Sequence, residues 1–192
     1  MEKLNLLLNA IQNDVFTLSD ASRAGLSRYY LTRLVEEEKV TELQKGVFQK
    51  RSASKSDDMQ TLSFKAATAK LKERSAVCLW SALSYYGLTD EVPKDVWFIL
   101  PYPYGLKSVK SIRLKDPKWD IGIVKNDGFS VTSIERTIVD CFLNSKYVPV
   151  SEAFEAMKRA IKDKKTSSKK LLNMASKLGA KEKLLPFLEI AL

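Results

Sequence analysis

The sequence predicts an α+β protein, with an N-terminal winged helix-turn-helix followed by a mixed α/β domain that has a helical C-terminal end. Three observations predict this fold class. In roughly the first fifty residues, apolar side chains recur at helical spacing and then alternate as they do in short strands. A polar stretch of small residues at 52–58 interrupts the pattern. Beyond it, helical and strand-like segments are mixed, and after about residue 132 only helical patterns occur.

Two helices are predicted to open the chain. The first covers residues 2–12, where the apolar residues at helical spacing are Leu4, Leu7, Leu8 and Ile11. The second covers 18–24, with Thr17 as its N-cap and Asp20 completing a capping-box pattern. Gly25 then turns the chain, because a positive φ costs little only for glycine.

A third helix is predicted over residues 28–38, after Ser27 as its N-cap. Its inward face carries Leu31, Leu34 and Val35. Its outward face carries Tyr29, Thr32, Arg33 and Glu36. A hairpin follows, with alternating strands at 40–43 and 47–50 joined by a turn at 44–46.

Residues 1–51 are therefore predicted to bind double-stranded DNA, with the third helix in the major groove and the hairpin as the wing. Arginines suit guanine or phosphate, hydroxyl groups can hydrogen-bond, and the basic hairpin residues can hold the flanking backbone. The predicted DNA contacts are Ser27, Arg28, Tyr29, Thr32, Arg33, Lys45, Lys50 and Arg51. However, this segment holds eight Lys/Arg against seven Asp/Glu, and the glutamates at 36–38 would repel phosphate. A winged helix that docks another protein is therefore an alternative.

Residues 52–58 are predicted to be a linker, and residues 59–192 a second, mixed domain. Helices are expected at 59–73, 76–86, from 134 onward, and at 150–163, 168–178 and 181–191. Strands are expected at 96–100, 109–114, 121–124 and 129–131. The pattern from Thr132 to Glu135 predicts a capping box that opens the helix at 134.

Several short motifs occur in a fixed order along the chain. They are Leu26–Arg28, Leu31–Val35, Lys45–Phe48, Ser81–Leu83, Gly87–Asp90, Pro93 and Thr132–Asp140. The first three resemble the N-terminal domain of AbiEi-type antitoxins, from the abortive-infection (AbiE) toxin–antitoxin systems of bacteria, and the others resemble their second domain. The resemblance spans about residues 5–145, and the rest of the chain is similar only in being helical and basic.

The resemblance implies a protein with two roles in antiviral defence. The winged helix would bind inverted repeats in the protein's own promoter and repress the operon. The second domain would counter a cognate toxin that resembles nucleotidyltransferases, and it would do so without a stable complex.

The net charge of +9 is concentrated near the C-terminus. Residues 155–192 hold ten Lys/Arg against four Asp/Glu. The basic C-terminal surface that this predicts consists of Lys158, Arg159, Lys162, Lys165, Lys169 and Lys170. It suits an anionic partner such as a DNA backbone, but a solvated helical face explains the same pattern.

The sequence offers little support for catalysis. Histidine is absent, which excludes His-dependent catalytic triads. Cys78 and Cys141 are expected to be reduced, buried thiols, and two cysteines without histidine leave little for a metal site. Arg136 and Asp140, spaced i,i+4, are interpreted as a surface ion pair, with Glu135 as the capping acid. We expect no catalytic residue, metal or cofactor. A protein-interaction adaptor and a nucleic-acid-processing enzyme are the alternative functions.

The composition is that of an ordinary globular protein, with 45% hydrophobic residues. No apolar run reaches the roughly 18–20 residues of a membrane helix, and the first residues lack the pattern of a signal peptide. A cytoplasmic protein without a membrane partner is therefore expected.

Overall fold

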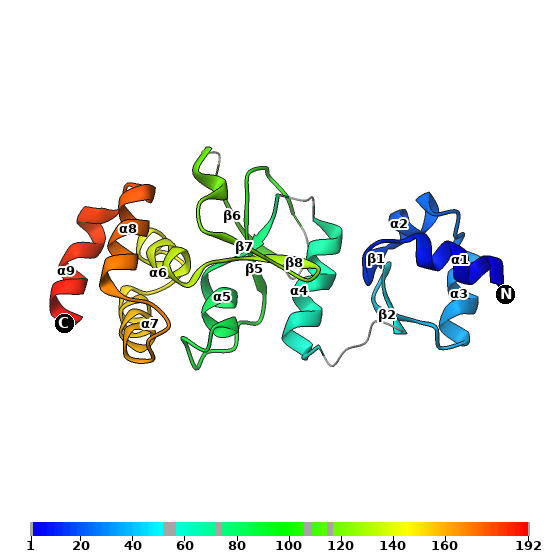
Figure 1. The fold of residues 1–192 in the computed structure, drawn as a ribbon, viewed down its shortest axis with the longest axis horizontal. Helices are drawn as coiled ribbons and strands as arrows, with labels where there is room; N and C mark the ends of the chain where they lie inside the picture. The colour runs from blue at the N-terminus through cyan, green and yellow to red at the C-terminus, as the bar shows by residue number, and fades with distance from the viewer. Residues whose placement is uncertain (1, 52–56, 72–73, 106–108, 115–116, 192) are drawn as a thin grey trace. The chain divides into compact units, whose positions relative to one another are not determined.

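The computed structural model describes residues 2–51, 57–71, 74–105, 109–114 and 117–191. The chain forms two compact units, Met1–Glu73 and Arg74–Leu192. Both units combine helices and strands, and the chain ends in helices, as the sequence predicts (Figure 1). Most of the predicted linker, residues 52–56, lies outside the described residues. Among the helices that are described, none is long and apolar enough to cross a membrane.

The first unit begins with short helices and a three-stranded sheet. Its elements are α1 (Glu2–Ala10), β1 (Val15–Thr17), α2 (Leu18–Arg23), α3 (Arg28–Glu36), β2 (Val40–Gln44) and β3 (Val47–Lys50). The sheet has the order β1-β3-β2, and both strand pairs are antiparallel. The predicted helices and hairpin are thus present. The sequence analysis missed β1, which is only three residues long.

One face of each of these helices packs into a common core. The core residues are Leu4, Leu8, Ile11, Phe16, Ala21, Leu26, Leu31, Leu34, Val40 and Phe48. The predicted capping box is present at α2, where the Asp20 carboxylate accepts a hydrogen bond from the Thr17 N–H at 2.8 Å. Gly25 has a φ of +86°, which strains any residue with a side chain, so the turn into α3 depends on this glycine.

Helix α4 (Met59–Lys70) belongs to the first unit, although the sequence analysis assigns it to the second domain. Its Ala66 forms a buried cluster with Val15 of β1 and Val47 of β3. The helical pattern identifies α4 but does not show which sheet it covers. The boundary between the units therefore lies after residue 73 rather than at the predicted residue 58.

The second unit has a five-stranded sheet followed by helices. Its strands are β4 (Ala76–Val77), β5 (Val96–Leu100), β6 (Val109–Arg113), β7 (Ile123–Asn126) and β8 (Phe129–Thr132). Their order is β6-β5-β4-β8-β7, with β5–β6 and β4–β8 parallel and the other pairs antiparallel. The helix predicted at 76–86 begins only at Leu79, because Ala76 and Val77 form β4.

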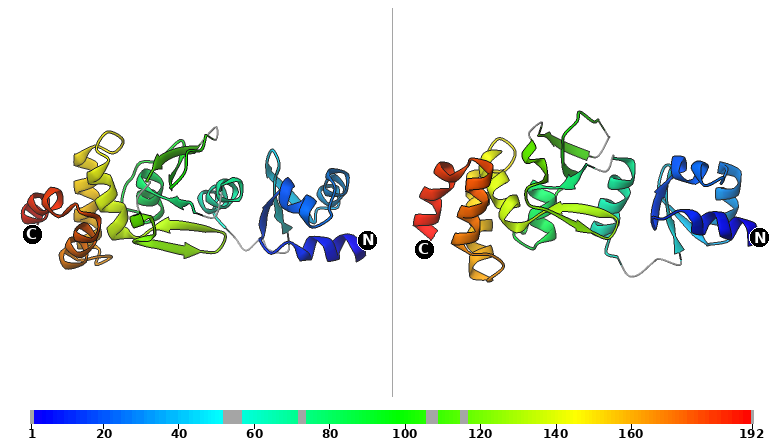
Figure 2. Two further views of the ribbon diagram at one scale, coloured as in Figure 1. Left: turned by 90° about the horizontal axis from the view of Figure 1, so that it is seen from above. Right: turned by 45° about the horizontal axis from the view of Figure 1, so that its top comes forward.

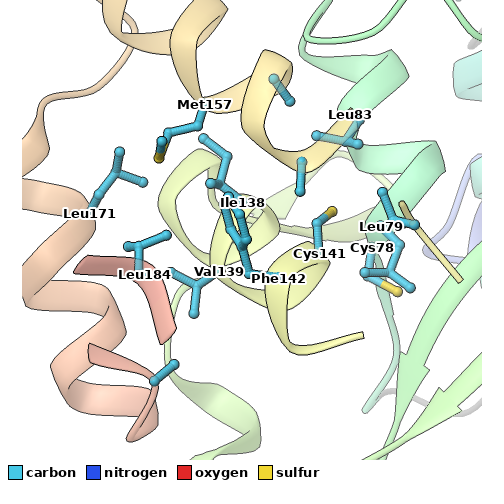
Figure 3. Packing of buried hydrophobic residues seen from close by; sticks show 14 of the residues in the cluster. Cys78, Leu79, Leu83, Ile138, Val139, Cys141, Phe142, Met157, Leu171 and Leu184 are labelled. Carbon is cyan, nitrogen blue, oxygen red and sulfur yellow. The ribbon is translucent and has the colours of Figure 1, made fainter. Parts of the chain in front are cut away.

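Helices cover one end of the second unit, as Figure 2 shows for α6 to α9. The helices of the unit are α5 (Leu79–Tyr85), η2 (Pro117–Asp120, a 3₁₀ helix), α6 (Ile134–Leu143), α7 (Val150–Lys162), α8 (Ser168–Leu178) and α9 (Lys181–Ala191). In Figure 3, five of these helices contribute side chains to one buried cluster: Leu83, Ile138, Met157, Leu171 and Leu184. Cys78 and Cys141 are free thiols in the same cluster, as predicted. Burial raises the pKa of both thiols well above the ordinary value, which makes them poor nucleophiles.

The Arg136–Asp140 pair is buried, so its interpretation as a surface ion pair is wrong. The Arg136 Nε lies 2.7 Å from the Asp140 Oδ2, and the two side chains are 1% and 6% exposed. A second guanidinium nitrogen donates to the Ile121 carbonyl at 2.6 Å. Burial raises the pKa of Asp140 to about 6, although the Arg136 charge acts to lower it. The pair therefore joins α6 to the segment before β7 inside the protein.

The capping box predicted at Thr132 is also wrong, because α6 is capped one residue later. The Ser133 hydroxyl accepts a hydrogen bond from the Arg136 N–H at 3.2 Å. Thr132 is buried in β8, and Glu135 accepts a hydrogen bond from the Thr166 hydroxyl at 2.7 Å instead of capping the helix. Both residues thus make contacts between elements, which a local pattern cannot reveal.

Candidate nucleic-acid interface

Helix α3 presents a polar and basic face to solvent. Leu31 and Leu34 bury its inner side, and the Ser27 hydroxyl caps it by accepting the Tyr30 N–H at 3.4 Å. All the contacts predicted on and just before this helix are exposed: Ser27, Arg28, Tyr29, Thr32 and Arg33. Residues at the start of a groove-entering helix are those that reach base edges. The structure therefore leaves this surface accessible to a nucleic acid.

The acidic residues at the end of α3 have cationic neighbours. The Glu37 carboxylate lies 3.1 Å from Lys39 Nζ and 4.0 Å from an Arg33 guanidinium nitrogen. The Glu38 carboxylate lies 2.8 Å from an Arg51 guanidinium nitrogen. These partners offset the charges of Glu37 and Glu38, which reduces the repulsion of phosphate by this segment.

Two side chains of α3 that are predicted to hydrogen-bond to DNA also make contacts within the protein. The Thr32 hydroxyl already donates to the Arg28 carbonyl at 3.1 Å. Tyr29 is 67% exposed, and its ring packs edge-to-face on Tyr30 with the centroids 5.6 Å apart. The sequence analysis missed Tyr30, which is 40% exposed. Its position beside Tyr29, in the first turn of the helix, could have indicated that Tyr30 also belongs to this surface.

Lys45 lies exposed at the tip of the β2–β3 hairpin, as predicted. The tip is fixed on two sides. The Gly46 N–H donates to the Glu42 carboxylate at 2.9 Å, and the Leu18 N–H donates to the Gly46 carbonyl at 3.0 Å. A lysine on a fixed tip beside the start of α2 suits a phosphate group.

Lys50 is not available to DNA, so its prediction as a phosphate contact is wrong. It is 8% exposed, and its ammonium group donates to the Ile11 carbonyl inside the first unit. The strand pattern of β3 did not reveal this, because all of its residues are buried once β1 and α4 cover it. Arg51 is exposed and bonded to Glu38, and its contact with DNA stays a prediction.

The predicted basic C-terminal surface lies on α7, on α8 and between them. Several of its cations have partners. Arg159 donates to both Asp90 carboxylate oxygens, at 3.0 and 2.8 Å, and these hydrogen bonds lower the pKa of Asp90. Lys165 Nζ donates to the Tyr86 carbonyl at 2.7 Å, and Lys158 pairs with a glutamate one turn earlier in α7. Arg159 and Lys165 therefore connect different elements of the second unit, whereas the Lys158 pair lies within α7.

The other half of the basic surface is Lys162, Lys169 and Lys170. All three are exposed. In the described part of the chain, none of them lies within ion-pair distance of a carboxylate. These lysines are therefore the ones most accessible to an anionic partner.

The surface of α3 and the hairpin offers hydrogen-bond donors, positive charge and aromatic rings, which are groups that suit binding to a nucleic acid. Among the residues that the structure describes, no group of three or more His, Cys, Asp or Glu side chains is placed to hold a metal ion. Both cysteines are buried away from this surface.

The segment that carries this interface, from α1 into β3, matches one known protein family. Residues 6–49 match the AbiEi antitoxin family. The family is described as "Transcriptional regulator, AbiEi antitoxin". The matched AbiEi segment contains α3 and Lys45 and ends just before Lys50. It confirms the family resemblance for the N-terminal part and covers less than a quarter of the chain.

Over most of the chain, the fold is similar to a solved structure, that of the RV2827C protein from Mycobacterium tuberculosis. The TM-score is 0.55 at 16% sequence identity, and the alignment covers 89% of this chain and 70% of the other. At this identity the likeness concerns the fold alone. Among curated proteins, no significant match to the sequence is found.

Proposed function

We propose that the first unit is a winged helix-turn-helix that binds double-stranded DNA, with α3 in the major groove and the β2–β3 hairpin as its wing. The observation that carries this proposal is the exposed, basic start of α3 inside the segment that matches the AbiEi family. Arg28 and Arg33 would pair with guanine edges or phosphates, and Lys45 would hold a flanking phosphate.

The DNA in this proposal is an inverted repeat in the protein's own promoter, and its occupation represses the operon. The family description as a transcriptional regulator supports this role. An inverted repeat offers the same half-site twice, so two copies of α3 would bind with two-fold symmetry. The proposed role in transcription also assigns the protein to the cytoplasm, where it would meet its promoter.

The second unit is proposed to serve the antitoxin role against a toxin that resembles nucleotidyltransferases. The family description as an antitoxin supports the role in general. In this proposal the protein neutralises the toxin without a stable complex, and it binds rather than catalyses. The exposed lysines of α7 and α8 are the candidate surface.

Mobility shift with the protein's own upstream DNA tests the DNA-binding proposal. The full chain should retard this duplex at concentrations at which an unrelated duplex of equal length and composition remains free. A promoter fusion in cells should lose expression when the protein is supplied, and this loss should disappear with the Arg28→Ala/Arg33→Ala variant. Equal retardation of both duplexes would contradict sequence-specific regulation. No retardation would favour the adaptor alternative, in which the same surface docks a protein.

Co-expression tests the antitoxin proposal. The gene adjacent to this one should inhibit growth when expressed alone, and growth should recover when this chain is supplied. Recovery should persist with the Arg28→Ala/Arg33→Ala variant, because the role is assigned to the second unit. An adjacent gene that is harmless alone, or toxicity that this chain leaves unchanged, would contradict the proposal.

A further inference from the structure

The outward face of α3 carries an aromatic pair that the proposed function does not yet explain. Tyr29 and Tyr30 are 67% and 40% exposed. They lie in the first turn of α3, directly after Arg28. Exposed rings that lie side by side offer an apolar contact area that a partner can cover. Here the rings lie where a groove-entering helix would meet base edges.

The geometry makes this pair an apolar and largely preformed surface. The rings meet edge-to-face, with centroids 5.6 Å apart and an interplanar angle of 64°. This contact restricts both side chains before any partner binds, which lowers the entropic cost of binding. Tyrosine also has few rotatable bonds for the contact area it supplies.

Thr32 extends the apolar character of this face by one turn. It lies three residues after Tyr29, so the two side chains are neighbours on the helix surface. Its hydroxyl hydrogen is used in the bond to the Arg28 carbonyl, at 3.1 Å. The methyl group of Thr32 is therefore the part of this side chain that is left for an apolar contact with a partner.

We infer that Tyr29 and the Thr32 methyl recognise the C5-methyl group of thymine in the major groove, so that this helix selects sites that contain thymine. The inference rests on the proposed DNA binding by α3. Thymine is the base whose major-groove edge carries a methyl group, and apolar side chains contact it there. The arginines on either side, Arg28 and Arg33, suit guanine, so the helix combines two kinds of base recognition.

Replacing thymine by deoxyuridine tests this inference directly, because it removes the methyl group and leaves the base-pairing edge intact. The upstream duplex is prepared in both forms, and each is titrated with the full chain at one salt concentration. The wild type should bind the thymine duplex more tightly by about fourfold for each contacted methyl group.

The variants assign the effect to the ring. Tyr29→Ala should weaken binding to the thymine duplex and lower the ratio of the two affinities toward one, leaving only the part that the Thr32 methyl contributes. Tyr29→Phe should keep the ratio, because it keeps the ring. Lys45→Ala is the control: it should weaken binding to both duplexes alike and leave the ratio unchanged. Circular dichroism of Tyr29→Ala should match the wild type, because the replaced side chain is mostly exposed.

Three outcomes would overturn the inference. If the wild type binds both duplexes equally, no methyl group is recognised, and a loss in Tyr29→Ala would then place the ring on the sugar–phosphate backbone. If Tyr29→Ala retains the wild-type ratio, another residue or the altered DNA shape is responsible. If the wild type binds neither duplex, the proposed DNA binding itself fails, and this inference fails with it.

Discussion

The β2–β3 hairpin carries two lysines, and only one of them faces solvent. Lys45 is exposed at the tip, whereas Lys50 is buried and donates to the Ile11 carbonyl. Lys45→Ala should weaken binding to all DNA sequences alike and reduce the salt slope by about one, because one phosphate contact is lost. Lys50→Ala should instead lower the free energy of unfolding by about 1–3 kcal/mol, because it leaves a buried carbonyl without a partner.

Titrations over a series of salt concentrations, together with thermal unfolding of each variant, separate these two effects. Lys45→Ala should keep the wild-type melting temperature, and folded Lys50→Ala should keep the wild-type salt slope. A reduced salt slope in Lys50→Ala, with unchanged stability, would show that Lys50 contacts phosphate after all.

The buried pair of α6 predicts a second effect at single residues. Arg136→Met should destabilise the protein by about 3–5 kcal/mol, because it leaves the Asp140 carboxylate buried without its partner. The double variant Arg136→Met/Asp140→Leu should recover much of that loss, because no buried charge remains. Chemical denaturation measures all three proteins. A single variant as stable as the wild type would mean that this pair is exposed to water.

The burial of these charged residues could not be predicted from the sequence. The i,i+4 spacing of Arg136 and Asp140 is the same on a helix surface and inside the protein, so the pattern could not reveal that they are buried. The burial of Lys50 could not be predicted either, because it depends on elements far away in the sequence. By contrast, Ser27, Arg28 and Lys45 were predicted to be exposed, since helical phase and turn position determine their exposure.

At the scale of elements, α4 is the helix whose partner the sequence did not indicate. Ala66 of α4 fills the gap beside Val15 and Val47, so these side chains would be exposed without the helix. A fragment of residues 1–73 should therefore unfold cooperatively and at a clearly higher temperature than a fragment of residues 1–58. Thermal unfolding followed by circular dichroism compares them. Equal melting temperatures would show that α4 adds nothing to the first unit.

Local signals in the first unit were predicted correctly, although the capping box at Thr132 in the second unit was not. The capping box at Thr17, the N-cap Ser27 and the glycine turn at Gly25 are all present, because each involves residues within four positions of one another. Strands β1 and β4 were missed, since two or three residues are too short for a period to be visible. They are recognisable only by the partners that they pair with, β3 and β5.

At the scale of the whole molecule, the proposal assigns two roles to two units. Reversing the accessible lysines, in a Lys162→Glu/Lys169→Glu/Lys170→Glu variant, should abolish toxin neutralisation and leave promoter repression intact. The structure favours this variant over a reversal that includes Arg159 or Lys165, because those two side chains make contacts within the unit. Surface changes of this kind cost little stability, so lost activity would reflect the surface itself.

A charge-matched control is available in the same unit. Reversal of Lys94, Arg113 and Lys125, which are exposed outside α7 and α8, should leave both roles intact. Growth in co-expression measures neutralisation, and the promoter fusion measures repression. If the folded α7–α8 variant keeps both roles, these lysines serve only to solvate the helices.

The most direct test of DNA binding by α3 is a fluorescence anisotropy titration at fixed salt. The wild type, Arg28→Ala, Arg33→Ala and the charge-matched control Arg113→Ala are each titrated with the upstream duplex and with a shuffled duplex. Each α3 variant should lose about 1–3 kcal/mol of specific binding, because a guanine or phosphate contact is removed, and should approach its affinity for shuffled DNA. Arg113→Ala should bind like the wild type. Unchanged affinity of both α3 variants for the upstream duplex would contradict the assignment of α3 to the major groove.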